Sequence, residues 1–165
     1  MSKPHQRIGS KSNAHVGREF ELATKNYFIT MGLELSKDIK IAIGVDEQKK
    51  EHAFDLGCEE KKILVECKSH KWTAPNDNVP SAKLTVWNEA MYYFHVSPSN
   101  YRKIFFVLRD YSNKRKETLA EYYIRTYGHL IPFEVEIWEF DETKKTAIQL
   151  PLNKRMQSDA AKPRR

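Results

Sequence analysis

Residues 52–71 read HAFDLGCEEKKILVECKSHK, and this stretch decides the fold. Two apolar-rich runs flank a short charged segment, a pattern typical of two β-strands joined by a tight turn. A turn centred between Glu60 and Lys61 places Asp55 opposite Glu66, with Lys68 two residues further along. The other face of this hairpin is then apolar and is formed by Phe54, Leu56, Cys58, Ile63, Val65 and Cys67. A shift of one residue would bury the charges, so the hydrophobic pattern fixes the register.

The segments on both sides of the hairpin predict further helices and strands. Helices are expected at 14–31, 82–96 and 116–127, and strands at 33–45, 101–109 and 133–140. Strand 101–109 contains the apolar run IFFVL, which is typical of a strand covered on both faces. The order of elements favours an α/β fold in which a central mixed sheet is flanked by helices.

Two details of the expected helices can be compared with a structure. Ser81 precedes the second apolar pattern and is expected to cap that helix. The first helix should bury a stripe formed by Val16, Phe20, Ala23, Tyr27 and Met31.

Length and composition predict one globular domain over residues 14–150 of the 165-residue chain. The chain has no run of about 18 apolar residues, so no membrane span is expected. Its start lacks the apolar segment of a secretory signal. Both cysteines lie in the hairpin but well apart, so we expect reduced thiols and a cytoplasmic location.

The net charge of +6 is concentrated at the two ends of the chain. Residues 1–13 carry +3 and residues 154–165 carry +4, which leaves −1 for the residues between them. We expect residues 1–13 to be flexible and residues 151–165 to be disordered. The basic charge therefore describes the ends, and only local clusters can support a nucleic-acid-binding hypothesis.

The charged face of the hairpin has the chemistry of a metal site. Asp55 and Glu66 offer oxygen ligands, which suit Mg²⁺ or Mn²⁺, and the carbonyl oxygen of Cys67 could complete the protein ligands. Lys68 could orient or help deprotonate an attacking water and neutralise charge that develops on a phosphoryl group. The alternative is a solvated face that carries an ordinary salt bridge.

The spelling Glu66-Cys67-Lys68 is weak evidence on its own. An acidic residue two positions before a lysine occurs six times in this chain, but only this copy ends an apolar strand. A zinc site built from His52, Cys58, Cys67 and His70 is not expected. Cys67 and His70 would point to opposite faces of their strand.

The hairpin and the helix before it resemble the PD-(D/E)xK phosphodiesterases, the restriction-endonuclease-like superfamily. Asp55 matches the motif's aspartate, although Phe54 stands where the name-giving proline would be, and Glu66 and Lys68 match the (D/E)xK element. The resemblance implies an α-β-β-β-α-β core and Mg²⁺-dependent cleavage of nucleic-acid phosphodiesters, with Mn²⁺ as a substitute. We expect a DNA endonuclease rather than a ribonuclease, and a homodimer if both strands of a duplex are cut.

The same resemblance extends to the first expected helix. Residues 17–21 spell a G-x-x-F-E setting, with Gly32 eleven residues after Glu21. The helical pattern leaves both Glu19 and Glu21 as candidates for an acidic residue near the site. The resemblance favours Glu21, with an expected role as a ligand of a second metal ion.

Basic residues outside the motif could contact phosphate groups of a substrate. The candidates are His70, Lys71, Lys83, Arg102, Lys103 and the run Lys114–Lys116. Solvated side chains are the ordinary alternative for each of them. A different class of function, a catalytically silent module that binds nucleic acid or a partner, also stays open.

The C-terminal sequence LNKRMQSDAAKPRR resembles the translated recombination site at the end of integron gene cassettes. This resemblance implies a mobile bacterial gene, and it would explain why the positive charge gathers in that segment.

Overall fold

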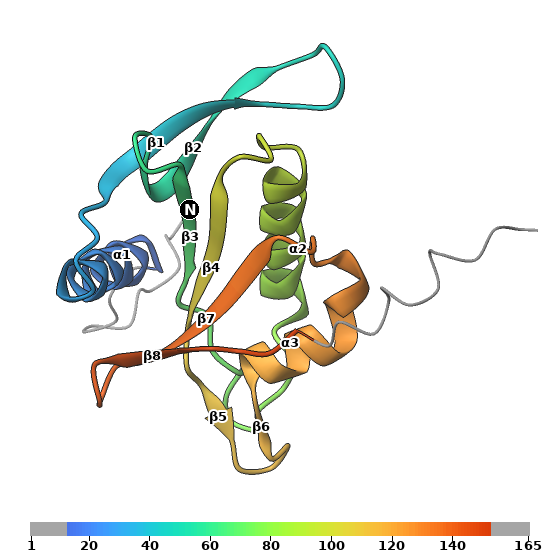
Figure 1. Ribbon diagram of the computed structural model, residues 1–165. Coiled ribbons are helices and arrows are strands. Elements are labelled where there is room, and N and C mark those ends of the chain that lie inside the picture. Colours follow the sequence, from blue (N-terminus) through green and yellow to red (C-terminus); the bar gives the residue numbers. More distant parts are fainter. Residues whose placement is uncertain (1–12, 153–165) are drawn as a thin grey trace, which may run out of the picture.

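A computed structural model describes residues 13–152, and the expectations for residues 1–12 and 153–165 lie outside the described residues. Three helices, a short 3₁₀ helix and eight strands follow one another along this part of the chain (Figure 1). The helices are α1 (Asn13–Thr30), α2 (Ser81–His95), α3 (Leu119–Tyr127) and the 3₁₀ helix η1 (Gly128–Leu130). The strands are β1 (Ser36–Ile43), β2 (Lys50–Cys58), β3 (Ile63–Lys68), β4 (Arg102–Leu108), β5 (Tyr111–Ser112), β6 (Glu117–Thr118), β7 (Val135–Asp141) and β8 (Thr146–Gln149).

Six strands form a mixed central sheet in the order β1-β2-β3-β4-β7-β8. Strands β3, β4 and β7 run parallel, so their carboxyl ends meet at one edge of the sheet, whereas β1, β2 and β8 are antiparallel to their neighbours. Helix α1 covers one face, and α2 and α3 cover the other (Figure 1). The expected α/β class, the mixed sheet and the order α-β-β-β-α-β at the start of the fold are confirmed.

The register predicted for the hairpin is confirmed near its turn and ends sooner than predicted. Leu56 pairs with Val65 and Cys58 pairs with Ile63, and no pair follows Leu56 toward the start of β2. Phe54 therefore does not face Cys67. It stacks on Phe94 of α2 with ring centroids 5.6 Å apart, whereas Leu56 packs in the core beneath α1.

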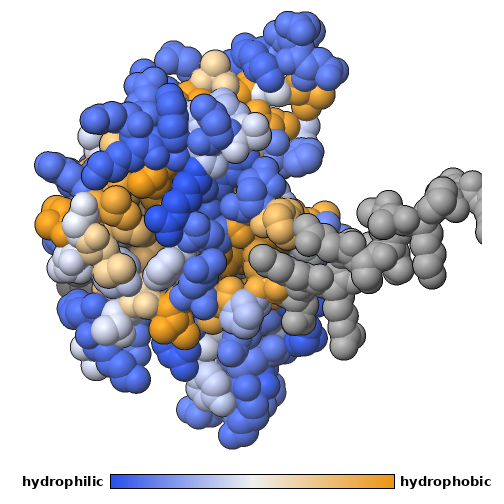
Figure 2. Space-filling model, in the orientation of Figure 1, coloured by the Kyte–Doolittle hydropathy of each residue, from blue (hydrophilic) through white to orange (hydrophobic). Residues whose placement is uncertain are grey.

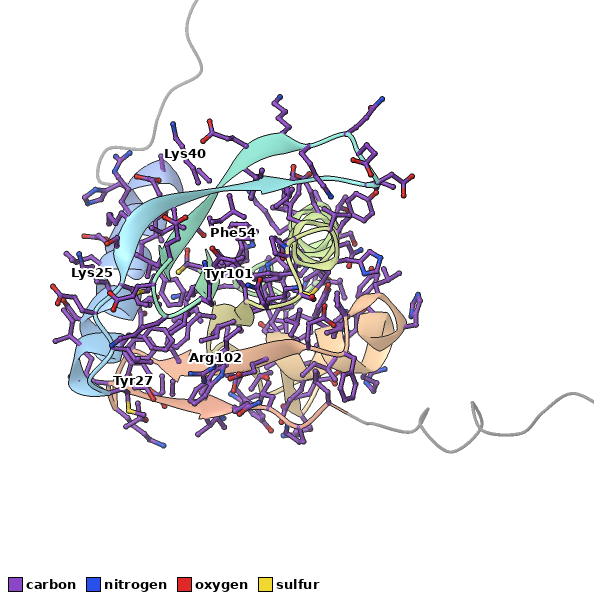
Figure 3. All side chains as sticks on the ribbon, turned by 45° about the horizontal axis from the view of Figure 1, so that its top comes forward. Lys25, Tyr27, Lys40, Phe54, Tyr101 and Arg102 are labelled. Carbon is purple, nitrogen blue, oxygen red and sulfur yellow. The ribbon has the colours of Figure 1, made fainter. Side chains whose placement is uncertain are left out.

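The departure of β2 from β3 explains why the hairpin has no continuous apolar face. The start of β2 stays paired with β1, and together they form an arm that extends past the top of α2 (Figure 1). In Figure 3, Phe54 lies inward beneath this arm and Lys40 lies on its outer side. Strand twist rotates the start of β2 relative to β3, so counting alternate residues no longer predicts which layer a side chain enters.

Helix α1 forms as predicted, but the buried stripe is shifted. Phe20 and Phe28 are buried against Phe106 of β4, with ring centroids 6.0 and 5.4 Å apart. Val16 and Met31 were expected in the stripe, and they are 37% and 57% exposed. They lie near the two ends of α1.

Three features of the second half of the fold differ from the expectation. Strands β5, β6 and β8 were not predicted, because each is only two to four residues long. Helix α3 begins at Leu119, since Thr118 accepts a hydrogen bond from the Glu121 backbone and forms a capping box. Ser81 is the first residue of α2 and does not cap it, and the capping position, Pro80, has no side-chain hydrogen bond.

Two further properties concern the helices and the cysteines of the described residues. Within residues 13–152, no helix has the length and apolar character that crossing a membrane requires. Cys58 and Cys67 are both free thiols.

Candidate active site

The candidate site lies where β2 leaves β3. Beyond the last pair, Leu56 with Val65, the backbone of β3 has no strand partner on its β2 side. The side chain of Asp55 takes this place, because its Oδ2 accepts a hydrogen bond of 2.7 Å from the backbone N–H of Cys67. A residue's N–H and C=O point to the same side of a strand, so the carbonyl oxygen of Cys67 also faces this opening.

Lys68 joins the two carboxylates of the predicted motif. Its Nζ lies 2.8 Å from Glu66 Oε2 and 3.7 Å from Asp55 Oδ2. The Glu66 residue is 5% exposed, and the side chain of Lys68 is 16% exposed. These charges therefore lie in a largely buried cluster and not on a solvated face.

Burial and the neighbouring charges set the protonation of the three groups. Burial, followed by the Glu66 carboxylate, raises the pKa of Asp55 from 3.8 to about 6. Burial opposes ionisation of Glu66, but the His52 hydrogen bond and the Lys68 ammonium lower its pKa overall. Burial also disfavours the Lys68 cation, but Glu66 and Asp55 outweigh it and raise the pKa of Lys68. At neutral pH the cluster therefore holds more negative than positive charge.

His52 contacts the site and was not predicted to do so. Its Nε2 lies 3.4 Å from Glu66 Oε1, and its ring contacts Tyr93 of α2 in a tilted arrangement with centroids 4.0 Å apart. This contact depends on the path of β2 over α2. The alternating pattern of the hairpin alone gives no signal for it, because it assumes that β2 and β3 stay paired.

Of the two acidic candidates on α1, Glu21 lies near the site. Asp55 owes its raised pKa first to burial, and the Glu21 carboxylate is close enough to contribute. Lys37 Nζ of β1 lies 3.4 Å from Glu21 Oε2. Glu19 pairs instead with His15 at 3.2 Å, one turn earlier on α1. Glu21 is therefore kept as the candidate acidic residue of α1, and its role at the site stays a prediction.

His70 and Lys83 lie beside Lys68 at the carboxyl ends of the parallel strands. Trp87 Nε1 donates a hydrogen bond of 2.8 Å to His70 Nδ1. Burial, followed by the nearby Lys83 and Lys68 ammonium groups, lowers the pKa of His70 to about 4. His70 is thus neutral at pH 7 and carries its proton on Nε2, so it can donate one hydrogen bond. Lys71, the next residue, is exposed.

The titration of His70 is a first test of this arrangement. We expect the ring of His70 to titrate near pH 4 in the folded protein, because burial and two nearby ammonium groups disfavour its cation. Two-dimensional NMR of the labelled imidazole across pH 3.5–8 measures the midpoint. The variant Trp87→Phe removes the hydrogen bond to Nδ1, and its His70 midpoint should rise. A wild-type midpoint near 6.5 would contradict the enclosed position of this ring.

Arg102 and Lys103 do not lie at the site. Both are at the start of β4, about five residues and roughly 16 Å before Val107, the residue that pairs with Lys68. Figure 3, in which this end of the molecule is turned toward the viewer, labels Arg102 and Tyr101. Arg102 makes two hydrogen bonds to Glu136, and Lys103 is fully buried with its Nζ 3.0 Å from Glu134. The expected phosphate contact at Lys103 does not agree with this burial.

The residues that could hold a divalent cation are Asp55, Glu66 and the carbonyl of Cys67. No group of three or more His, Cys, Asp or Glu side chains within residues 13–152 is arranged to hold a metal ion. Mg²⁺ is commonly bound by one or two carboxylates together with waters and substrate phosphates, and does not need a full set of protein ligands. The raised pKa of Asp55 is the mark of a negative charge that a cation would stabilise. The donor set therefore fits Mg²⁺ or Mn²⁺.

Cys67 and His70, two of the four residues considered and rejected as zinc ligands, lie in different layers of the fold. Cys67 packs in the core beneath α1, whereas His70 contacts Trp87 of α2, so their side chains lie on opposite faces of the sheet.

Comparison of the chain with protein families, with curated proteins and with solved structures finds no match. The geometry of the site is therefore the basis for a function.

Proposed function

We propose that this chain is a metal-dependent nuclease of the PD-(D/E)xK type that cleaves DNA. The observation that supports it is the buried cluster in which Lys68 bridges Asp55 and Glu66 beside the open side of the Cys67 backbone. The four matched positions come from two separate segments, α1 and the β2–β3 hairpin. Their position on neighbouring elements of one fold supports a functional site better than the sequence motif alone does.

Each residue has a role that follows from its position. A divalent cation bound by Asp55, Glu66 and the Cys67 carbonyl would act as a Lewis acid toward a phosphoryl oxygen and lower the pKa of water. Lys68 stays protonated because its pKa is raised, so it donates hydrogen bonds and does not act as a base. It would orient the attacking water and stabilise negative charge on the phosphoryl oxygens. Glu21 would assist at the edge of the site.

The electrostatics argue against a catalytically silent module. A purely structural cluster gains nothing from an extra carboxylate whose ionisation is opposed by burial. Asp55 is such a carboxylate, since its pKa is raised to about 6. If the substrate is duplex DNA cut in both strands, two copies of the chain are required, because each contributes one such site.

A cleavage assay tests the proposal with a control inside the same hairpin. Glu66→Gln should lower Mg²⁺-dependent cleavage of plasmid DNA by about 100-fold or more, because it removes one charged ligand. Glu60→Gln is the matched control, since Glu60 also lies two positions before a lysine but is exposed in the turn. Single-stranded DNA, RNA, Mn²⁺ and chelator complete the assay. Equal activity in the two variants would overturn the assignment, and DNA binding without cleavage in any metal would favour the silent module.

A further inference from the structure

Two loops project from the sheet edge at which the candidate site lies. Loop 71–80 leaves β3 directly after the Lys68 segment, and the β5–β6 hairpin, residues 109–118, leaves β4. Since β3 and β4 are parallel, both loops emerge at the same edge. Figure 1 shows β5 and β6 beyond the end of β4, at the end of the molecule opposite the β1–β2 arm. We call these two loops together the finger.

Hydrogen bonds join the two loops of the finger into one unit. Ser112 Oγ donates to Asp77 Oδ2 at 2.7 Å, and Arg115 Nε donates to the Asp77 carbonyl at 2.8 Å. Lys114 Nζ lies 3.3 Å from the carbonyl oxygen of Asn76. At the base, the backbone N–H of Trp72 donates to the Asp110 carboxylate at 2.7 Å. The finger is therefore cross-linked along its length.

The charges of the finger are distributed unequally between its inside and its outside. Its acidic groups have partners within the fold, since Asp77 and Asp110 accept the bonds just described and Glu117 pairs with Arg125 at 2.7 Å. Lys71, Lys114 and Lys116 are exposed. Within residues 13–152 none of these three ammonium groups has a carboxylate within ion-pair distance. The outer surface of the finger is basic, and Figure 2 shows this end of the molecule as predominantly hydrophilic.

At the opposite edge of the parallel strands, the cations of β4 itself are paired with carboxylates. There Arg102 is paired with Glu136 and Lys103 with Glu134, so the cations at the start of β4 are neutralised. Lys83 extends the basic surface from the finger toward the site. It lies close enough to His70 to lower the pKa of that ring, although burial is the larger cause. The finger and Lys83 thus form a continuous basic surface that leads to Lys68. Lys61 and Lys62, in the β2–β3 turn at the other end of β3, are also exposed and provide a charge-matched comparison.

The shape and composition of the finger fit a double helix better than a single strand. A two-stranded β-ribbon fits the major groove, which is about 12 Å wide and 8.5 Å deep. The turn at 113–116 lies about three residues beyond the start of β5, so it extends roughly 10 Å from there. Single-strand binding relies on several exposed aromatic rings. The finger exposes one, Tyr111, whereas Trp72 is buried beneath the guanidinium of Arg115, 4.9 Å from its ring centre. Exposed amides, from Asn76, Asn78 and Asn113, are of the kind that contact base edges.

We infer that the finger enters the major groove of double-stranded DNA and holds the duplex against the candidate site. This inference rests on the proposed nuclease function for its substrate, but it concerns binding and not cleavage. Lys114 and Lys116 contact phosphates on the two sides of the groove, and the bonds of Asp77 keep the hairpin rigid enough to fit it.

The salt dependence of duplex binding tests the inference. The full chain is titrated with a labelled 20-base-pair DNA duplex, and with a single strand of equal length, in chelator at several salt concentrations. The double variant Lys114→Gln, Lys116→Gln should lower the slope of log K against log salt by about 2 for duplex DNA. The matched control Lys61→Gln, Lys62→Gln removes the same charge from the exposed β2–β3 turn at the opposite end of β3 and should leave the slope unchanged.

Each outcome either supports or overturns the inference. A loss of slope confined to the finger variant and to duplex DNA supports it. An unchanged slope, an equal loss in both variants, or a larger effect on the single strand overturns it, and an unchanged slope would instead suit a finger that contacts a protein. Because chelator prevents cleavage, a wild-type chain without nuclease activity but with the finger effect would refute only the proposed function. Active enzyme with an unchanged slope would refute only the finger.

Discussion

Lys68→Ala is expected to abolish cleavage and to destabilise the metal-free protein at pH 8. Lys68 Nζ lies 2.8 Å from Glu66 and 3.7 Å from Asp55, and no other ammonium group within residues 13–152 lies within ion-pair distance of either carboxylate. Removing one partner of a largely buried ion pair leaves the other charges uncompensated, which costs about 3 kcal/mol. We expect this loss in the free energy of unfolding, measured with urea in chelator, and a fall in cleavage rate of at least about 100-fold.

The pH dependence of this loss identifies its cause. Without the ammonium group, the raised pKa of Asp55 rises further in the folded state and the lowered pKa of Glu66 rises too, because their mutual repulsion is no longer offset. A carboxyl with a raised folded-state pKa contributes stability at low pH that is lost as the pH rises. The deficit of Lys68→Ala should therefore be larger at pH 8 than at pH 5, and Mg²⁺ should reduce it. Lys62→Ala, an exposed lysine in the turn, is the control, and an equal deficit at both pH values would refute this account.

The sequence predicts the part of the hairpin that is governed by local pairing. Near the turn, Leu56 meets Val65 and Cys58 meets Ile63, because side-chain alternation and the position of a tight turn determine these pairs. Further along, Phe54 leaves for the core beneath α2, and this depends on the twist of β2 and on the helix over which it passes. Residues 52–71 alone predict neither the twist of β2 nor the position of α2.

The same distinction explains which site residues could be predicted. Asp55, Glu66 and Lys68 follow from one register and one alternating face, and the structure brings them together. His52 reaches Glu66 only because β2 diverges from β3, so the predicted hairpin gave no sign of it. Lys103 was a candidate because of its charge, but its partner Glu134 is 31 residues away in the chain. Pairing over such distances is a property of the packed fold.

Asp55→Asn is expected to abolish cleavage as Lys68→Ala does but to change stability in the opposite direction. The pKa of Asp55 rises from 3.8 to about 6 on folding, first through burial and then through Glu66. Its favourable contribution is therefore complete below pH 3.8 and is lost as the pH rises through 6, so ionised Asp55 destabilises the metal-free fold at pH 8. Asparagine cannot ionise, and its side-chain oxygen can still accept the hydrogen bond from the Cys67 backbone.

In chelator at pH 8, Asp55→Asn should raise the free energy of unfolding by about 2 kcal/mol, because each pKa unit corresponds to about 1.4 kcal/mol and the side chain is partly exposed. Urea unfolding at pH 8 and pH 4.5 measures this gain, which should fall to about a third at the lower pH, because unfolded Asp55 is still mostly ionised there. Glu60→Gln should change neither value. Mg²⁺ should stabilise the wild-type protein and not the variant. A site with one carboxylate in excess predicts two inactive variants with opposite effects on stability. The Lys68 ammonium group relieves the repulsion between the two carboxylates, whereas ionised Asp55 adds to it. A site assembled only for structural stability would instead lose stability when either residue is replaced.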